Sequence, residues 1–347
     1  MNFTRYLAAA LLAAQTTAAI PQGTASNPIT AESFARAAAY SESSNGVALL
    51  VTAEGRILHE RYPARGGPGI PRELASGTKS FCGILACLLA EDGLLELDEP
   101  VSRTITEWRD IPGKRDITVR QLLTLTSGLK TGGERGAVPT FREALAAPLE
   151  SQPGLVFRYG AVPFQVFGEV AKRKLGGRDP VEYLDERLFR LLDIRPGRWT
   201  RGTDGNPHLP SGAAFASRDW ARFGEFIRRG GSWDGRMIVP KDILASCFVG
   251  TAANPAYGLT FWLNRETSQE LRDLIPQLEN GSEYLYDLDF VPKDLVFAAG
   301  AGKQRLYIIP SLGLVIVRQG DRIRESLTGA YRSDFSDREF FRLLFNR

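Results

Sequence analysis

"SGTKSFCGILACLLAEDG", residues 76–93, has the apolar spacing of a helix that is buried in a protein core. Its large apolar residues follow the i, i+3, i+4, i+7, i+8 pattern and are Phe81, Ile84, Leu85, Leu88 and Leu89. Gly93 fits the end of such a helix, because glycine readily adopts the left-handed backbone found after a C-terminus. Ser76 therefore opens a helix that enters the core.

Lys79 follows Ser76 by three residues and so lies on the same helix face. Partial burial and the positive end of the helix dipole both favour a neutral amine, the form that a lysine base requires. The N–H groups of the first turn also point to where an oxyanion would form. From these residues alone, Ser76 is either a nucleophile with Lys79 as its base or an ordinary capping serine.

Ser127 and Lys130 in "SGLKTGG" repeat the same spacing and act as an internal control. The pattern of residues 119–129, "VRQLLTLTSGL", predicts a helix that runs into Ser127 and stops at Gly128. At a helix C-terminus the dipole favours a protonated lysine, so this pair lacks the environment of a nucleophile and its base.

Strand patterns lie at both ends of the chain and helical patterns between them. Residues 46–52 and 55–62 predict a β-hairpin after a helix over 30–42. Late strands are predicted at 257–263, 294–300, 304–310 and 313–320, followed by an amphipathic helix within 334–347. The expected fold is α+β, with an antiparallel sheet built from the N- and C-terminal segments, flanked by helices. We expect one domain over 20–347, with a helical subdomain inserted at about 95–250.

Composition limits the classes of function. The chain has 347 residues, with 43 basic against 40 acidic side chains, and no basic stripe that would bind nucleic acid. Residues 1–19 have the short apolar stretch and small residues of an export signal, which predicts a periplasmic or secreted protein. No segment is long enough for a stable membrane span.

Metal and disulfide chemistry are not indicated. The 2 histidines and the absence of metal-ligand spacing predict no metal site. The 3 cysteines, Cys82, Cys87 and Cys247, are interpreted as small buried residues, because an odd count does not suit a disulfide framework.

Several segments together resemble the serine β-lactamase-related family, which groups class C β-lactamases, D-Ala-D-Ala carboxypeptidases and family VIII carboxylesterases. In chain order they are "ASGTKSF", "TVRQLLTLTSGL", "PGLVFRYGAVPFQVFGEV", "PSGAAFASRDWARFGEFIRRGG" and "GKQRLYIIPSLGLVIVRQG". The resemblance covers roughly residues 45–325 and implies that Ser76 and Lys79 are catalytic.

The second family motif, Tyr-x-Asn, is altered. Tyr159 in "RYGAV" matches the tyrosine that exchanges protons with the lysine, but Ala161 replaces the asparagine. In β-lactamases that amide contacts the lysine and the amide side chain of the substrate. Because related esterases dispense with it, its loss disfavours β-lactam turnover rather than hydrolysis itself.

The third family motif, Lys-Thr-Gly or His-x-Gly, is altered as well. The "KTG" at 130–132 is a decoy, because it precedes Tyr159 and is expected in a loop. The matching stretch is "FAAGAGKQ", where Gly300, Ala301 and Gly302 are the candidate oxyanion and substrate-binding residues and the Ala301 N–H is the second oxyanion donor. The alternative is a plain glycine-bearing hairpin turn. Lys303 or Arg305 could replace the missing basic residue.

The two histidines are interpreted as structural. A Ser-His-Asp hydrolase needs a histidine beside its serine, but His59 falls in a strand and His208 in a loop. There is also no Gly-x-Ser-x-Gly elbow.

The sequence therefore predicts a serine hydrolase that cleaves a small ester or amide through a Ser76 acyl-enzyme, with Tyr159 as proton shuttle and no cofactor. A carboxylesterase is favoured. The alternatives are a β-lactamase or D-Ala-D-Ala carboxypeptidase, and a non-catalytic binding protein that reuses the fold.

Overall fold

The computed structural model describes residues 29–63, 65–132, 137–270, 288 and 290–347. The export signal expected at 1–19 lies outside these residues. Within them, no helix combines the length and the apolar character needed to cross a bilayer.

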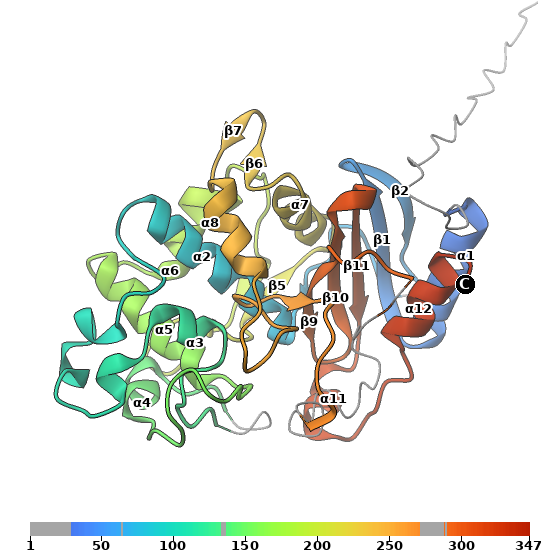
Figure 1. The fold of residues 1–347 in the computed structure, drawn as a ribbon. Coiled ribbons are helices and arrows are strands. Elements are labelled where there is room, and N and C mark those ends of the chain that lie inside the picture. The colour runs from blue at the N-terminus through green and yellow to red at the C-terminus, as the bar shows by residue number, and fades with distance from the viewer. Residues whose placement is uncertain (1–28, 64, 133–136, 271–287, 289) are drawn as a thin grey trace, which may run out of the picture.

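One antiparallel sheet joins the two ends of the chain. Its strand order is β2-β1-β11-β10-β9-β8, so the N-terminal hairpin lies beside the C-terminal strands (Figure 1). The strands are β1 (Gly46–Ala53), β2 (Arg56–Arg61), β8 (Trp262–Leu263), β9 (Val296–Gly300), β10 (Gln304–Ile309) and β11 (Leu314–Gly320). The α+β fold expected from the sequence is confirmed.

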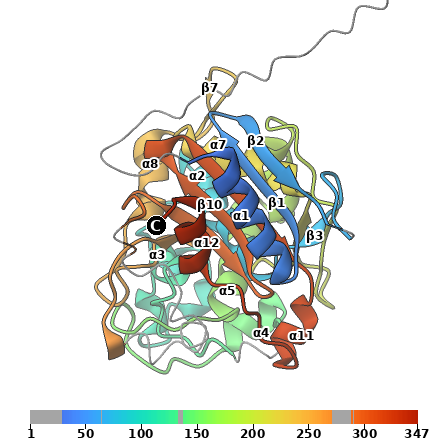
Figure 2. The same ribbon diagram turned by 90° about the vertical axis from the view of Figure 1, so that its right-hand side faces the viewer.

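Helices cover both faces of this sheet. α1 (Ala31–Ser43) and α12 (Asp337–Leu344) pack against each other on one face, and α7 (Ser217–Arg228) packs on the other (Figure 2). Every residue of β10 and β11 is buried as a result. The runs "LYII" in β10 and "LVIV" in β11 are therefore apolar without alternation, as expected for strands covered on both faces.

Between the hairpin and β9, on the side of α7, loops and short strands join a set of helices (Figure 1). They are α3 (Val119–Leu123), α4 (Phe141–Ala146), α5 (Val162–Lys174), α6 (Pro180–Leu184) and α8 (Lys241–Ala245), with α11 (Ile323–Thr328) after the sheet. Short strands are β3 (Arg72–Glu73), β4 (Arg198–Trp199), β5 (Ala213–Phe215), β6 (Ser232–Trp233) and β7 (Arg236–Met237).

Two predicted elements are shorter than expected. The helix predicted over 119–129 ends at Leu123, because Leu125 adopts a left-handed backbone with φ +61° and breaks the turn before Ser127. The strand predicted over 257–263 is reduced to Trp262–Leu263. Gly258 donates its N–H to the Phe261 carbonyl at 2.9 Å, so the residues before β8 form a tight loop instead.

The predicted core helix is present and is buried on all sides. It is α2 (Lys79–Glu91), preceded by a 3-10 turn, η1 (Ala75–Thr78), and its residues from Lys79 to Leu89 are all buried. Gly93 follows the helix with φ +68°, as predicted. The three cysteines are free and buried, and the Cys87 Sγ lies 3.4 Å from the Cys247 Sγ.

Candidate active site

Ser76 lies in η1, at the point where the chain turns from β3 into α2. Ala75, just before it, has φ +46°, a conformation that is unfavourable for a residue with a Cβ. The turn is held by hydrogen bonds from the Gly77 N–H to the Leu74 carbonyl (2.9 Å) and from the Thr78 hydroxyl to the Ala75 carbonyl (2.7 Å). The surrounding bonds thus hold Ser76 in a strained turn at the head of the core helix.

Lys79 and Ser76 form a direct pair. The Lys79 Nζ donates to the Ser76 Oγ at 2.9 Å and to the Pro210 carbonyl at 3.1 Å. Lys79 is 4% exposed, so its amine is almost completely removed from solvent. Burial disfavours the charged form of a lysine, which suits a group that must accept a proton.

Tyr159 lies over the same lysine. It stands in the loop before α5, and the Lys79 Nζ lies 4.7 Å from the centroid of its ring. The Lys79 Nζ also lies 5.3 Å from the centroid of the Phe164 ring. Two aromatic faces beside one amine would stabilise the ammonium that forms when Lys79 accepts a proton. The structure thus brings Ser76, Lys79 and Tyr159 into one cluster.

The control pair is not assembled in this way. Ser127 is buried, and its Oγ accepts a long hydrogen bond from the Leu129 N–H, at 3.4 Å. Lys130 is exposed. The "KTG" of residues 130–132 lies in a loop, as expected, and the Thr131 carbonyl accepts hydrogen bonds from Ala161 and Val162 at 3.3 Å each. This loop therefore supports the segment that carries Tyr159.

Gly300 ends β9 directly against the Ser76 turn. A Cβ on Gly300 would lie 2.0 Å from the Leu74 carbonyl oxygen and 3.0 Å from the Gly77 nitrogen, so only glycine permits this approach. Ala301 follows at the start of the hairpin turn. Gly302 faces elsewhere, because a Cβ there would meet Ile323 and Asp321.

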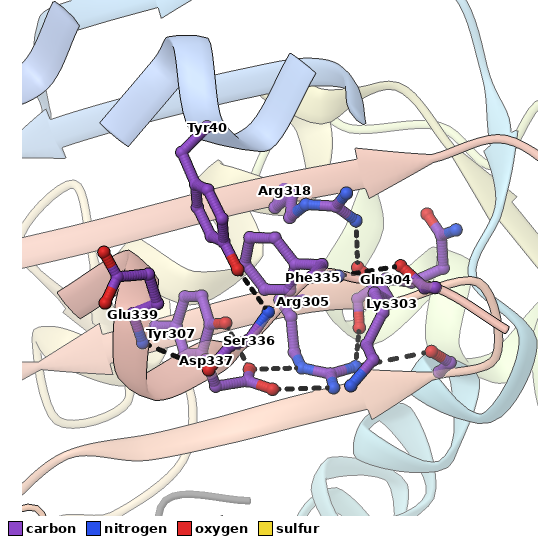
Figure 3. A network of polar contacts seen from close by, with 12 residues as sticks. Tyr40, Lys303, Gln304, Arg305, Tyr307, Arg318, Phe335, Ser336, Asp337 and Glu339 are labelled. Atoms are coloured by element: carbon purple, nitrogen blue, oxygen red, sulfur yellow. Dashed lines mark hydrogen bonds and ion pairs between the residues drawn. The ribbon is translucent and has the colours of Figure 1, made fainter. Parts of the chain in front are cut away.

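Arg305 does not replace the missing basic residue of the third motif. It is 1% exposed, and its guanidinium pairs with Asp337 of α12, with Nε–Oδ1 at 2.7 Å (Figure 3). Burial alone would raise the pKa of Asp337, but the Arg305 charge holds that pKa below its usual value. Because this charge is neutralised inside the protein, Arg305 cannot serve a substrate carboxylate.

An aromatic cluster that the sequence analysis missed supports Tyr159. The Trp262 ring stacks on the Tyr159 ring at 6.0 Å between centroids and an angle of 24°. Tyr257 makes an edge contact with Trp262 at 4.9 Å and with Tyr159 at 6.4 Å. The sequence pattern places Tyr257 and Trp262 in one strand. The loop that brings their rings together depends on tertiary contacts, so the local sequence does not indicate it.

The same loop contacts α2, the helix that follows Ser76. Thr260 has φ +71°, which is rare for a β-branched residue. A Cβ on Gly83, one turn after Lys79, would lie 2.5 Å from the Thr260 Oγ1. Residues 257–262 thus connect Tyr159 to α2 through a strained segment, and such strain is often found at functional sites.

Replacing Trp262 with alanine should lower kcat/KM about 10- to 100-fold, because Tyr159 loses the surface that orients it. The lost packing should also lower the free energy of unfolding by about 3–5 kcal/mol. Kinetics and thermal unfolding of Trp262→Ala and Trp262→Phe would measure both effects. Trp108→Ala is the matched control, since Trp108 is 1% exposed and hydrogen-bonds Leu145 of α4. Equal kinetic losses in Trp262→Ala and Trp108→Ala would contradict the positioning role.

Neither histidine belongs to the cluster. The His59 ring stacks on Phe34 at 5.8 Å, and the His208 Nε2 lies near Gly202. Burial lowers the pKa of His59 and of His208 below the ordinary value of 6.5. Both side chains therefore favour the neutral state in the folded protein.

These lowered pKa values predict a loss of stability on mild acidification. Below pH 6.5 the unfolded chain binds protons at both histidines before the folded protein does. The melting temperature should therefore fall as the pH is lowered from about 7 to about 5. Thermal unfolding across this range would measure the slope, and a His59→Gln/His208→Gln double variant should flatten it. If the melting temperature of that variant fell with pH as steeply as in the wild type, the two histidines would not be the cause of the pH dependence.

A hollow of about 520 Å³, lined by several charged residues, does not include the cluster. It opens between β3, β5 and α11, and its charged lining residues include Arg72, Glu73, Arg198 and Asp321. None of Ser76, Lys79 or Tyr159 lines it. The cluster is therefore assigned from its contacts and not from this hollow.

Comparison with known proteins gives a family match over most of the chain. A family model described as Beta-lactamase matches residues 31–319. Among curated proteins, the chain is 27% identical over 213 residues to "Acyltransferase calJ" of Penicillium decumbens, a match that covers 50% of each chain. The chain spans between about a third and a half of the length of the first curated relatives it matches.

Solved structures share the fold at low identity. "EstCE1, a hydrolase with promiscuous acyltransferase activity" has a TM-score of 0.64 at 18% identity, covering 89% of this chain and 98% of that one. A penicillin-binding protein homologue from Caulobacter crescentus has a TM-score of 0.63 at 17% identity, covering 86% and 94%. At these identities the likeness establishes the fold alone.

Proposed function

This chain belongs to the beta-lactamase family, and on that basis we propose that it is a serine hydrolase acting through a Ser76 acyl-enzyme. The observation that carries the proposal is the pair formed by the partly exposed Ser76 Oγ and the buried Lys79 Nζ, 2.9 Å apart. A nucleophile within hydrogen-bonding distance of its base, with the base itself oriented by a third group, is the arrangement that activates serine. Here the third group is the Pro210 carbonyl.

In the first half-reaction, neutral Lys79 accepts the Ser76 proton while the Ser76 Oγ attacks the carbonyl carbon of the substrate. The lysine ammonium that forms is stabilised by the rings of Tyr159 and Phe164. Tyr159 then passes a proton to the leaving alcohol or amine and recovers one from Lys79. The bond from the carbonyl carbon to the leaving group breaks, and Ser76 is left acylated.

In the second half-reaction, water replaces the leaving group. Tyr159 and Lys79 take a proton from the water as it attacks the acyl carbon, and the proton returns to the Ser76 Oγ as the acid departs. In both steps the oxyanion is bound by the backbone N–H groups of Ser76 and Ala301. The close packing of Gly300 on the Leu74 carbonyl supports the second of these donors.

An uncharged carboxylic ester is the favoured substrate. Ala161 offers no amide to a β-lactam or peptide side chain, and residues 299–301 offer no cation to a substrate carboxylate. Arg305 is neutralised by Asp337. The names of two similar proteins, an acyltransferase and a hydrolase with acyltransferase activity, support acyl transfer from such esters and raise transfer to an alcohol as a second candidate.

Steady-state hydrolysis of p-nitrophenyl acetate and butyrate, a chromogenic cephalosporin and a D-Ala-D-Ala peptide tests the proposal. We expect ester turnover to exceed the other two by at least about 100-fold in kcat/KM. A better rate on the cephalosporin would favour a β-lactamase, and a better rate on the peptide a carboxypeptidase. Added alcohol that appears in the product would reveal acyl transfer.

A fluorophosphonate probe separates the enzyme from a binding protein. We expect the probe to modify Ser76 in the purified protein. Mass spectrometry of its peptides would locate the modified residue. A protein that neither turns over any of these substrates nor reacts with the probe would be the non-catalytic alternative.

We further propose that the protein acts outside the cytoplasm, on the basis of the export signal expected at residues 1–19. Fractionation of cells that express the full chain, with N-terminal sequencing of the product, tests this. An intact N-terminus in the cytoplasmic fraction would contradict it.

A further inference from the structure

The hairpin turn that carries Ala301 is held from behind by buried side chains. Gly302 and Lys303 have φ values of +71° and +58°. Glycine adopts such values readily, but they are unfavourable for Lys303, which has a Cβ. The surroundings of the turn must therefore hold it.

Three buried side chains bind the carbonyl groups of this turn. Arg318 donates to the Lys303 carbonyl at 2.8 Å, and Gln304 donates to the Gly302 carbonyl at 3.2 Å. Arg305 donates to the Gln304 carbonyl at 3.0 Å and to the Gly300 carbonyl at 3.4 Å. All three donors are 1% exposed or less, so water does not compete for these bonds.

Asp337, the first residue of α12, fixes the direction of Arg305. It is 0% exposed, and its two oxygens bind the Arg305 Nε at 2.7 Å and Nη2 at 3.1 Å. The Tyr307 hydroxyl donates to the same carboxylate (Figure 3). A buried guanidinium without its carboxylate would be uncompensated, so loss of the Asp337 charge must change the position or surroundings of Arg305.

The other side of the turn meets the nucleophile. Gly300 packs on the Leu74 carbonyl and the Gly77 nitrogen, the residues that flank Ser76. The turn is thus clamped between the Ser76 segment and the buried network. A shift of the network displaces the Ala301 N–H relative to Ser76.

We propose that Asp337, through Arg305, is a positioning residue for the oxyanion-binding N–H of Ala301. This inference rests on the proposed serine hydrolase function. If Asp337 has this role, α12 contributes to stabilising the transition state, although it lies on the face of the sheet opposite α7 (Figure 1). Asp337 itself touches neither substrate nor nucleophile.

Asp337→Asn is the test, because it removes the charge and nearly preserves the shape. We expect kcat for p-nitrophenyl acetate to fall about 10- to 100-fold with KM changed less than about 2-fold, since the oxyanion exists only in the transition state. The Kd of phenylboronic acid, whose serine adduct is tetrahedral, should rise by the same factor. All measurements are made well below the melting temperature of each variant.

Glu225→Gln is the matched control. Glu225 is 3% exposed and pairs with Arg228 of α7 and with Arg229, the residue after it, so its variant also removes a buried carboxylate charge from ion pairs with arginine. We expect it to lower the melting temperature and to leave kcat and the boronate Kd unchanged. If Asp337→Asn folds poorly, Tyr307→Phe removes one hydrogen bond from the same carboxylate and should lower kcat about 3-fold in the same pattern.

Each outcome is decisive. Wild-type kcat in Asp337→Asn with a lowered melting temperature would overturn the proposal, as would equal losses of kcat in Asp337→Asn and Glu225→Gln. A wild-type protein that neither hydrolyses esters nor binds the boronate would overturn the proposed function and this inference with it. Ester turnover that is lost in Ser76→Ala but unaffected in Asp337→Asn would overturn this inference alone.

Discussion

Replacing Ser76 with alanine is expected to lower kcat/KM for p-nitrophenyl acetate by at least about 1,000-fold. The variant lacks the hydroxyl that lies 2.9 Å from the Lys79 amine, so the proposed acyl-enzyme cannot form. Folding should be nearly unchanged, because Ser76 is partly exposed and lies in a turn held by its neighbours. Steady-state kinetics and intact-protein mass after fluorophosphonate treatment would measure both losses.

Ser127→Ala is the control for that experiment. It removes the hydroxyl of the other serine that stands three residues before a lysine, and its buried Oγ makes a 3.4 Å contact with the Leu129 N–H. We expect wild-type turnover within about 2-fold. If Ser127→Ala abolished turnover and Ser76→Ala did not, the assignment of the nucleophile would be wrong.

Gly300→Ala should lower kcat/KM about 100-fold or more, although it adds only one methyl group. That methyl would stand 2.0 Å from the Leu74 carbonyl oxygen, so β9 and the Ser76 turn must separate by more than 1 Å. A displacement of this size removes an oxyanion donor from its place. The loss should appear in kcat and in the rate of fluorophosphonate labelling.

Gly69→Ala is the corresponding control, because a Cβ at Gly69 meets nothing within 4 Å. It should leave turnover and melting temperature unchanged. Wild-type activity in Gly300→Ala would show that the contact between β9 and the Ser76 turn is not part of the catalytic machinery.

The parts of the site that the sequence could predict are the local ones. Ser76 and Lys79 stand three residues apart at the start of the core helix, and the helical turn brings them together. Ser127 and Lys130 have the same spacing but lie outside a helix, and they do not form such a pair. The hairpin of β1 and β2 was also predictable, because a short turn, "AEG" at 53–55, separates two runs with strand character. In the structure, Glu54 and Gly55 of this turn both have positive φ.

The parts that could not be predicted depend on contacts between distant residues. Arg305 looked available for a substrate, but its carboxylate partner Asp337 comes from another element 32 positions later. Trp262 and Tyr257 looked like members of one strand, and only tertiary packing turns them onto Tyr159. The hydrophobic periodicity of a sequence indicates which face of a helix or strand is apolar, but it does not indicate which side chains that face contacts.

The pairing of β1 with β11 and of α1 with α12 has a consequence for biosynthesis. Ser76, Lys79 and Tyr159 are synthesised before β10 and β11, the strands at the centre of the sheet, and before α12, the helix that holds Arg305. At roughly 5–20 residues per second, a ribosome needs on the order of tens of seconds between Ser76 and Asp337. During that interval the nascent chain carries Ser76 without an assembled oxyanion site, so enzymatic activity should begin only after α12 has been synthesised and has packed on the sheet.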